Sequence, residues 1–130
     1  MVPYKLKNKE LVPLFKKLKA ILSQYEDKFV VQDDVLGDYG LLTNKEVEIN
    51  GRKKKNLYFA GLIIQKSYVG FYFMPIYFKK DLAKYFEPEL LSKLKGKSCF
   101  YIKKDDPIIM KQIKNALEMG LKMYKTRGWI

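Results

Sequence analysis

The longest apolar run of the chain extends from Leu57 to Tyr77 and is interrupted in its middle by the polar tripeptide at 65–67. A membrane-spanning helix would be most apolar at that point, so the run does not fit one. Its two halves, Leu57–Ile64 and Tyr68–Tyr77, have strand length and are rich in aromatic and β-branched residues. We therefore predict two antiparallel strands joined by a turn at 65–67.

Side chains alternate between the two faces of a strand, and the alternation divides this hairpin into two unlike faces. One face is expected to carry Phe59, Gly61, Ile63, Val69, Phe71 and Phe73. The other is expected to carry Tyr58, Ala60, Leu62, Ile64, Tyr68, Gly70, Tyr72 and Met74. The Phe-bearing face suits a core under helices. The tyrosine-bearing face suits a partly open surface, because each phenol hydroxyl needs a partner or water.

Helical periodicity appears near both ends of the chain. Apolar residues recur at steps of three and four over Lys9–Tyr25, and again after Asp106-Pro107, where Asp106 is the expected N-cap and Pro107 the first helical residue. Further strands are predicted at Tyr39–Thr43, Val47–Ile49 and Lys97–Lys103, and a short helix at Lys79–Phe86. This order predicts an α+β fold: an antiparallel sheet of about five strands, N- and C-terminal helices packed on one face, and a short helix before the last strand.

Length and cysteine content bound the class of protein. A chain of 130 residues is expected to form a single domain, spanning 1–130. The one cysteine, Cys99, excludes an internal disulfide and favours a reducing compartment. The first five residues contain no apolar signal segment, so we expect a cytoplasmic protein with no membrane association.

The net charge of +12 raises the question of nucleic-acid or polyanion binding. Only Arg52 and Arg127 are arginine, so 24 of the 26 basic residues are lysine, whereas nucleic-acid sites favour arginine for bidentate contacts. Two interpretations stay open: a solvated lysine-rich surface, which is favoured, and weak nonspecific polyanion binding. The residues expected to carry the latter lie on the outer faces of the two long helices: Lys16, Lys17, Lys19, Lys111, Lys114 and Lys122.

The stretch NLYFAGLIIQKSYVGFYFMPIY, the short helix after it, and LKGKSCFYIKKDDP opening the last helix resemble the YdhG-like domain family. The resemblance covers most of the chain, to about Lys125, and implies a sheet with the terminal helices on one face and the other face partly open. Family members are small bacterial proteins, mostly of unknown function. One branch is likened to frataxin, an iron-delivering protein that uses acidic side chains, so the resemblance implies iron as a cargo. The chain departs from the family pattern at Leu41-Leu42 and at Tyr68.

Classical catalysis is hard to assemble from these residues. The chain has no histidine, which is the commonest general base and metal ligand. Cys99 therefore lacks a histidine partner, and it lies in a predicted strand. Gly96-Lys97-Ser98 is similar to the end of a phosphate-binding loop, but the required first glycine is replaced by Leu91 and a strand follows. We expect a protein that is not an enzyme.

Two candidate sites follow for a noncatalytic binding protein. The first is the tyrosine-bearing face, where a small molecule, a protein partner or a second copy of the chain would contact Tyr58, Tyr68, Tyr72, Met74 and Tyr101. A second, minor core under loops is the alternative interpretation of that face. The second site is the acidic segment 26–38, where hard cations or iron would bind Glu26, Asp27, Asp33, Asp34 and Asp38. Charge balance at a helix end is the alternative there.

Overall fold

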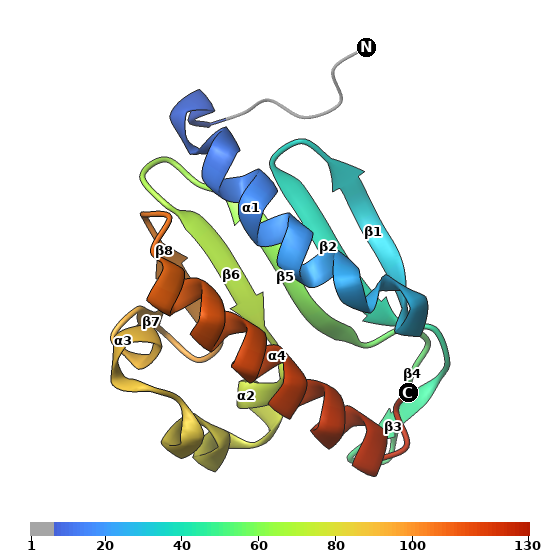
Figure 1. The fold of residues 1–130 in the computed structure, drawn as a ribbon. Helices are drawn as coiled ribbons and strands as arrows, with labels where there is room; N and C mark the ends of the chain where they lie inside the picture. Colours follow the sequence, from blue (N-terminus) through green and yellow to red (C-terminus); the bar gives the residue numbers. More distant parts are fainter. Residues whose placement is uncertain (1–6) are drawn as a thin grey trace.

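The predicted central hairpin forms the middle of a six-stranded antiparallel sheet (Figure 1). The computed structural model describes residues 7–130, so the expectation about a signal segment concerns residues outside this range. The strands follow the spatial order β1-β2-β5-β6-β8-β7. Their bounds are β1 Phe29–Val35, β2 Asp38–Thr43, β5 Tyr58–Ile64, β6 Val69–Phe73, β7 Leu94–Lys95 and β8 Cys99–Ile102. A separate hairpin consists of β3 (Val47–Ile49) and β4 (Arg52–Lys54).

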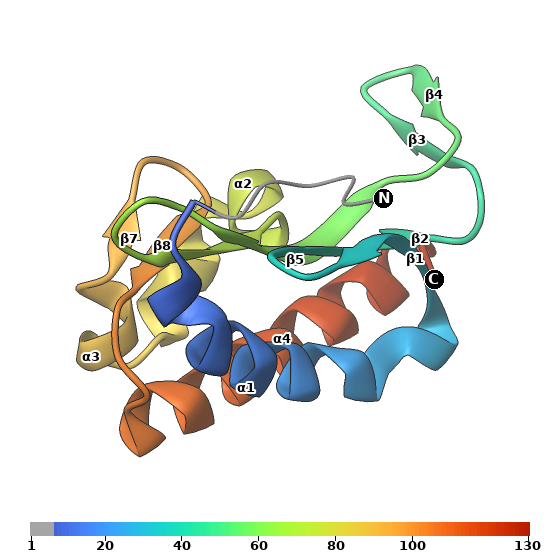
Figure 2. The same cartoon turned by 90° about the horizontal axis from the view of Figure 1, so that it is seen from above.

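Two long helices cover one face of the sheet, as the sequence predicted (Figure 2). Helix α1 (Val12–Leu22) carries Pro13 in its first turn and continues into the 3₁₀ segment η2 (Ser23–Lys28). Helix α4 (Pro107–Thr126) begins with the expected cap, because the Asp106 carboxylate accepts a hydrogen bond of 2.9 Å from the Ile108 N–H. Both helices direct their apolar stripes at the sheet, and this interface contains the core.

The predicted helix at 79–86 begins earlier than expected and is divided. Pro75 ends the pairing of β6 and opens the short helix α2 (Pro75–Phe78), because proline suits a first helical turn but cannot donate to a strand ladder. The 3₁₀ segment η3 (Lys80–Tyr85) and the short helix α3 (Pro88–Leu91) follow. These three segments lie beside α4 and lead to the edge strand β7 (Figure 1).

The sheet has one strand more than the five or so expected. The acidic stretch 26–38 contains β1, which pairs with β2 at the sheet edge. The pairing is irregular between Gln32 and Val35, and Asp33 adopts a positive φ of 53° there. The predicted strand at 47–49 forms, but it is not part of the large sheet. It pairs with β4 in the small hairpin rather than with the large sheet.

A β-bulge corrects the predicted division of faces in β5. Leu41 pairs with Ala60, but its neighbour Leu42 pairs with Tyr58, so Phe59 is the extra residue on β5. Both Phe59 and Ala60 are consequently buried in the core. In the rest of β5, each side chain consequently lies on the face opposite to the one predicted. Ala60, Leu62 and Ile64 pair with the core residues of β6, while Gly61 and Ile63 lie on the face of the tyrosines.

The bulge is supported from below by the end of α4. The hydroxyl of Tyr124, a fully buried residue, donates a hydrogen bond of 2.7 Å to the carbonyl oxygen of Tyr58. The Tyr124 ring also packs edge-on against Phe59, with ring centroids 5.1 Å apart. Helix α4 therefore fixes the backbone of Tyr58, whose side chain extends to the opposite face of the sheet.

Candidate functional site

The face of the sheet opposite the helices carries the predicted tyrosines, and we call it the tyrosine face. Tyr58 lies flat on it, above two glycines that pair with each other across β2 and β5. A Cβ on Gly61 would lie only 1.6 Å from the Tyr58 hydroxyl oxygen, and one on Gly40 would lie 3.2 Å from a ring carbon. Burial raises the pKa of Tyr58, and the nearby Asp38 carboxylate raises it further. Tyr58 is therefore a neutral phenol at ordinary pH.

Tyr72 lies beside this ring at the centre of the tyrosine face. The side-chain amide of Gln65 donates a hydrogen bond of 3.1 Å to the Tyr72 hydroxyl, and Gln65 itself accepts one of 2.9 Å from the Lys7 ammonium. Burial raises the pKa of the Cys99 thiol, and the neighbouring Tyr72 hydroxyl lowers it by less. The thiol consequently stays protonated, which makes it a weak nucleophile.

Tyr68 and Tyr101 form a stacked pair on the same face. Their ring centroids are 3.7 Å apart and the rings are nearly parallel, at 9°. A hydrogen bond to Tyr101, together with desolvation, raises the pKa of Tyr68 to about 12. All five residues expected at a ligand site, including Met74 after the end of β6, are half-buried. The structure brings these residues onto one face, and their role in binding stays a prediction.

A cleft opens at the end of the tyrosine face where Tyr58 and Met74 lie. The β3–β4 hairpin rises from the sheet on the side opposite α1 and α4 (Figure 2) and forms one wall. We call this space of about 990 Å³ the hairpin cleft. Its apolar and aromatic lining consists of Ile49, Leu57, Tyr58, Met74, Tyr77 and Phe78. Its polar lining consists of Asn50, Arg52, Lys53, Lys54, Lys97 and Ser98.

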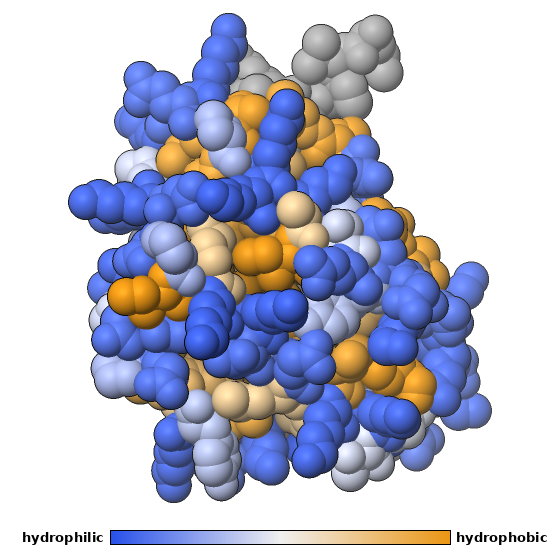
Figure 3. All heavy atoms as spheres, viewed as in Figure 1, coloured by the Kyte–Doolittle hydropathy of each residue, from blue (hydrophilic) through white to orange (hydrophobic). Residues whose placement is uncertain are grey.

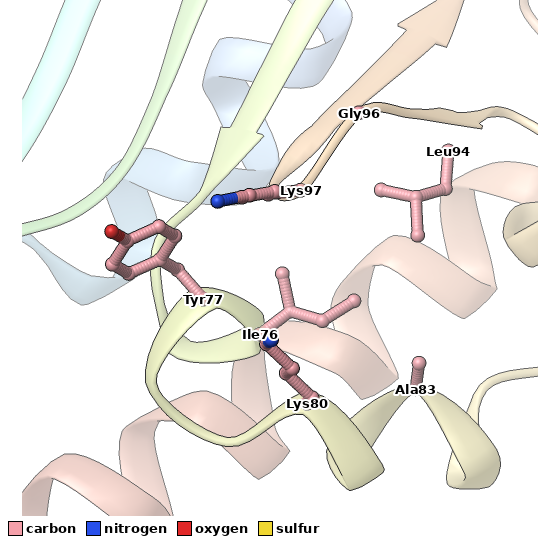
Figure 4. A pocket seen from close by; sticks show the side chains of 7 residues that line it. All are labelled: Ile76, Tyr77, Lys80, Ala83, Leu94, Gly96 and Lys97. Carbon is pink, nitrogen blue, oxygen red and sulfur yellow. The ribbon is translucent and has the colours of Figure 1, made fainter.

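A smaller hollow of about 210 Å³ adjoins the hairpin cleft and shares Tyr77 and Lys97 with it (Figure 4). The Lys97 ammonium lies 5.8 Å from the centroid of the Tyr77 ring. Sequence reasoning missed both residues. It also assigned no site to the basic run 52–55, although three of its four residues line the cleft. The available signal is the Asn50-Gly51 pair, which favours a tight hairpin turn and so holds this basic strand in a defined place.

The acidic residues of 26–38 are divided among several partners. Glu26 accepts a hydrogen bond of 2.5 Å from the Tyr39 hydroxyl, and Asp34 pairs with Lys19. Asp27 lies 3.8 Å from the adjacent Lys28 ammonium. Burial, with the nearby Asp33, raises the pKa of Asp38. Across residues 7–130, no three His, Cys, Asp or Glu side chains are grouped so that they could hold a metal ion. Iron binding stays a prediction.

The lysines proposed for polyanion binding lie on α1 and α4, which share one side of the molecule (Figures 1 and 3). This side is mostly hydrophilic, with separate hydrophobic patches between the polar side chains (Figure 3). Lys17 pairs with Asp105 at 2.7 Å, and Lys19 pairs with Asp34. The remaining four, Lys16, Lys111, Lys114 and Lys122, are exposed. Polyanion binding by this surface stays a prediction.

Comparisons with protein-family models, with curated proteins and with solved structures find no significant match. The resemblance to the YdhG-like family accordingly stays a prediction that rests on the quoted motifs. No helix within residues 7–130 combines the length and apolar character needed to cross a membrane.

Proposed function

We propose that this protein is a noncatalytic binding protein that holds a small molecule in the hairpin cleft. The cleft itself carries the proposal. Its volume of about 990 Å³ is that of a ligand site, which typically spans about 300–1,000 Å³. Three stretches distant in sequence meet there: the β3–β4 hairpin, the region of α2, and the turn before β8. Tyr58 and Met74, expected as ligand contacts from the sequence alone, are part of its wall.

The protonation states of the ionisable groups near the cleft are consistent with ligand binding rather than catalysis. Burial raises the pKa of Tyr58 and of Cys99, so both groups keep their protons at neutral pH. Neutral phenols and thiols are poor bases and poor nucleophiles, but they donate hydrogen bonds to a bound molecule. The mixture of aromatic walls and a few polar groups is typical of sites that orient a ligand.

A screen of small-molecule fragments, followed by amide NMR shifts on the full chain, tests this function. We expect fragment-induced shifts to gather at Tyr58, Met74 and Tyr77. Ser98→Phe places a large side chain in the lining and should abolish them. Ser67→Phe makes the same substitution in the exposed β5–β6 turn and should leave them unchanged. Shifts that avoid the cleft, or that survive Ser98→Phe, would contradict the proposal.

A protein partner on the tyrosine face, including a second copy of this chain, is the alternative. Native mass spectrometry of protein purified without added ligand separates the two. A mass above the 15.4 kDa of the chain by a few hundred daltons supports a small ligand. A dimer that Tyr72→Asp dissociates would support the partner instead.

A further inference from the structure

The charged lining of the hairpin cleft has a single sign. Three of the charges, on Arg52, Lys53 and Lys54, come from β4, and the fourth, on Lys97, comes from the turn before β8. Among residues 7–130, no acidic residue lines the cleft. Within residues 7–130 none of these four side chains takes part in an ion pair. Glu48 lies directly opposite Lys53 in the hairpin, so Arg52, Lys54 and Lys97 are the lining cations with no carboxylate directly opposite them. Such cations repel one another and concentrate anions from solution. The cleft is therefore suited to an anionic ligand.

Flat aromatic surfaces lie among these charges. Tyr77 is 49% exposed although it is a large hydrophobic residue, and its ring meets Phe78 edge-on at 5.5 Å. Tyr58 contributes a second ring, which rests on the glycines of the sheet. An exposed tyrosine ring beside a lysine ammonium offers a stacking surface for a planar, electron-rich group. The cleft thus offers stacking surfaces and cations within one space.

We infer that the ligand of the hairpin cleft is a nucleotide, with its base stacked on Tyr77 and its phosphate held by Arg52 and Lys97. This inference rests on the proposed function, since it names the chemistry of the molecule that the cleft would bind. A nucleotide combines a planar ring with a phosphate anion, and each part matches one component of the lining. Arginine suits the phosphate because its planar fork can donate two hydrogen bonds to it at once.

A second space adjoins the hairpin cleft. The smaller hollow shares Tyr77 and Lys97 with the cleft, and Lys80 and Leu94 also line it (Figure 4). A free nucleotide and a nucleotide within a single strand share the base and phosphate chemistry. They differ in whether the adjoining hollow is also filled.

Titration of the full chain with ATP, adenosine, inorganic phosphate and a ten-nucleotide oligo(dA), by calorimetry and amide NMR, tests the inference. We expect ATP or the oligonucleotide to bind at least about tenfold more tightly than adenosine or phosphate, because only they engage both rings and cations. Similar affinities for ATP and the oligonucleotide indicate a free nucleotide. Much tighter binding of the oligonucleotide, with added shifts at Lys80 and Leu94, indicates a single strand.

Matched variants separate a built site from general charge. Arg52→Gln with Lys97→Gln should weaken binding by about tenfold or more. Lys111→Gln with Lys114→Gln removes the same net charge from α4 and should change the affinity less than about twofold. Tyr77→Leu should weaken binding by at least about fivefold through lost stacking. Tyr85→Leu removes a tyrosine that is 67% exposed and lies outside the cleft, and it should have no effect.

Three results would overturn the nucleotide inference. The first is an equal loss of affinity in the Arg52→Gln/Lys97→Gln variant and in the Lys111→Gln/Lys114→Gln variant, which would indicate that net charge alone determines binding. The second is binding of adenosine as tightly as ATP. The third is the absence of ATP and oligonucleotide binding at millimolar concentration while fragments still shift the cleft, which leaves the proposed function standing. Loss of the fragment shifts as well would overturn the proposed function too.

Discussion

Removing the Tyr124 hydroxyl should destabilise the protein measurably, although the residue touches no solvent. In Tyr124→Phe the ring and its packing against Phe59 remain, and the hydrogen bond to the carbonyl of Tyr58 is lost. The acceptor lies at the β5 bulge in a partly buried hydrogen bond, and the donor belongs to a fully buried side chain. An acceptor that loses its partner where water cannot replace it costs about 1–3 kcal/mol, which is more than the net value of an average hydrogen bond.

The expected change in melting temperature follows from the size of the chain. Unfolding entropy is about 2.1 cal/mol/K per residue, or about 270 cal/mol/K for 130 residues. A loss of about 1–3 kcal/mol then lowers Tm by about 4–11 °C. Thermal unfolding followed by circular dichroism resolves a shift of this size, and urea unfolding supplies the free energy independently.

Tyr25→Phe is the matched control for this experiment. The Tyr25 hydroxyl donates to the carboxylate of Glu118, an exposed residue that can bond water instead. We expect this deletion to cost less than Tyr124→Phe, because water can replace the lost partner of the carboxylate. Equal losses in the two variants, or a loss below about 0.5 kcal/mol in Tyr124→Phe, would refute the reasoning about the bulge carbonyl.

Three further changes test other parts of the fold. Gly120→Ala should destabilise the protein by about 1–2 kcal/mol in urea unfolding, because the new Cβ would lie 2.6 Å from Phe73 and 2.7 Å from Pro75. This overpacking exceeds the gain in helix propensity, so a stabilised variant would contradict the prediction. Asp106→Ala should lower the free energy of unfolding by about 1 kcal/mol through loss of the α4 cap. Asp106→Asn keeps a capping oxygen and should retain most of that stability in the same assay. Burial raises the folded-state pKa of Tyr39 and Tyr124 above the unfolded value of 10.0, so their neutral forms stabilise the fold below pH 10 and this stability is lost as pH rises beyond it. Tyrosinate absorbance and circular dichroism should then change together; ionisation of all tyrosines before unfolding would be inconsistent with this burial.

The sequence was sufficient for the elements whose patterns are locally strong. The apolar run at 57–77 predicted β5 and β6, and the spacing of apolar residues predicted both long helices. The Asp106-Pro107 pair predicted the start of α4, since a cap and a first-turn proline act through local chemistry. β1 was missed because it is an edge strand whose residues Gln32–Asp34 are exposed, so it shows no regular apolar alternation.

The candidate site was predicted only in part, for a different physical reason. Tyr58 and Met74 were found because they follow the alternation of the central hairpin. The bulge at Phe59 inserts one residue without changing the composition, so the alternation assigned Ala60 and Leu62 to the wrong face. The cleft itself depends on how the β3–β4 hairpin and the turn at 96–98 approach each other in space, and no local pattern records such an approach.

The irregular pairing of β1 has a consequence for association between molecules. An edge strand presents unpaired N–H and C=O groups, which can recruit a strand from another chain. Here one edge is interrupted at Asp33, whose positive φ disfavours an incoming strand, as do the charges of Asp33 and Asp34. The other edge, β7, is only two residues long. Both ends of the sheet are thus protected against extension into a larger sheet. Extension of the six-stranded sheet by a strand from another copy is therefore disfavoured, so copies that associate through this sheet are expected to use side-chain contacts.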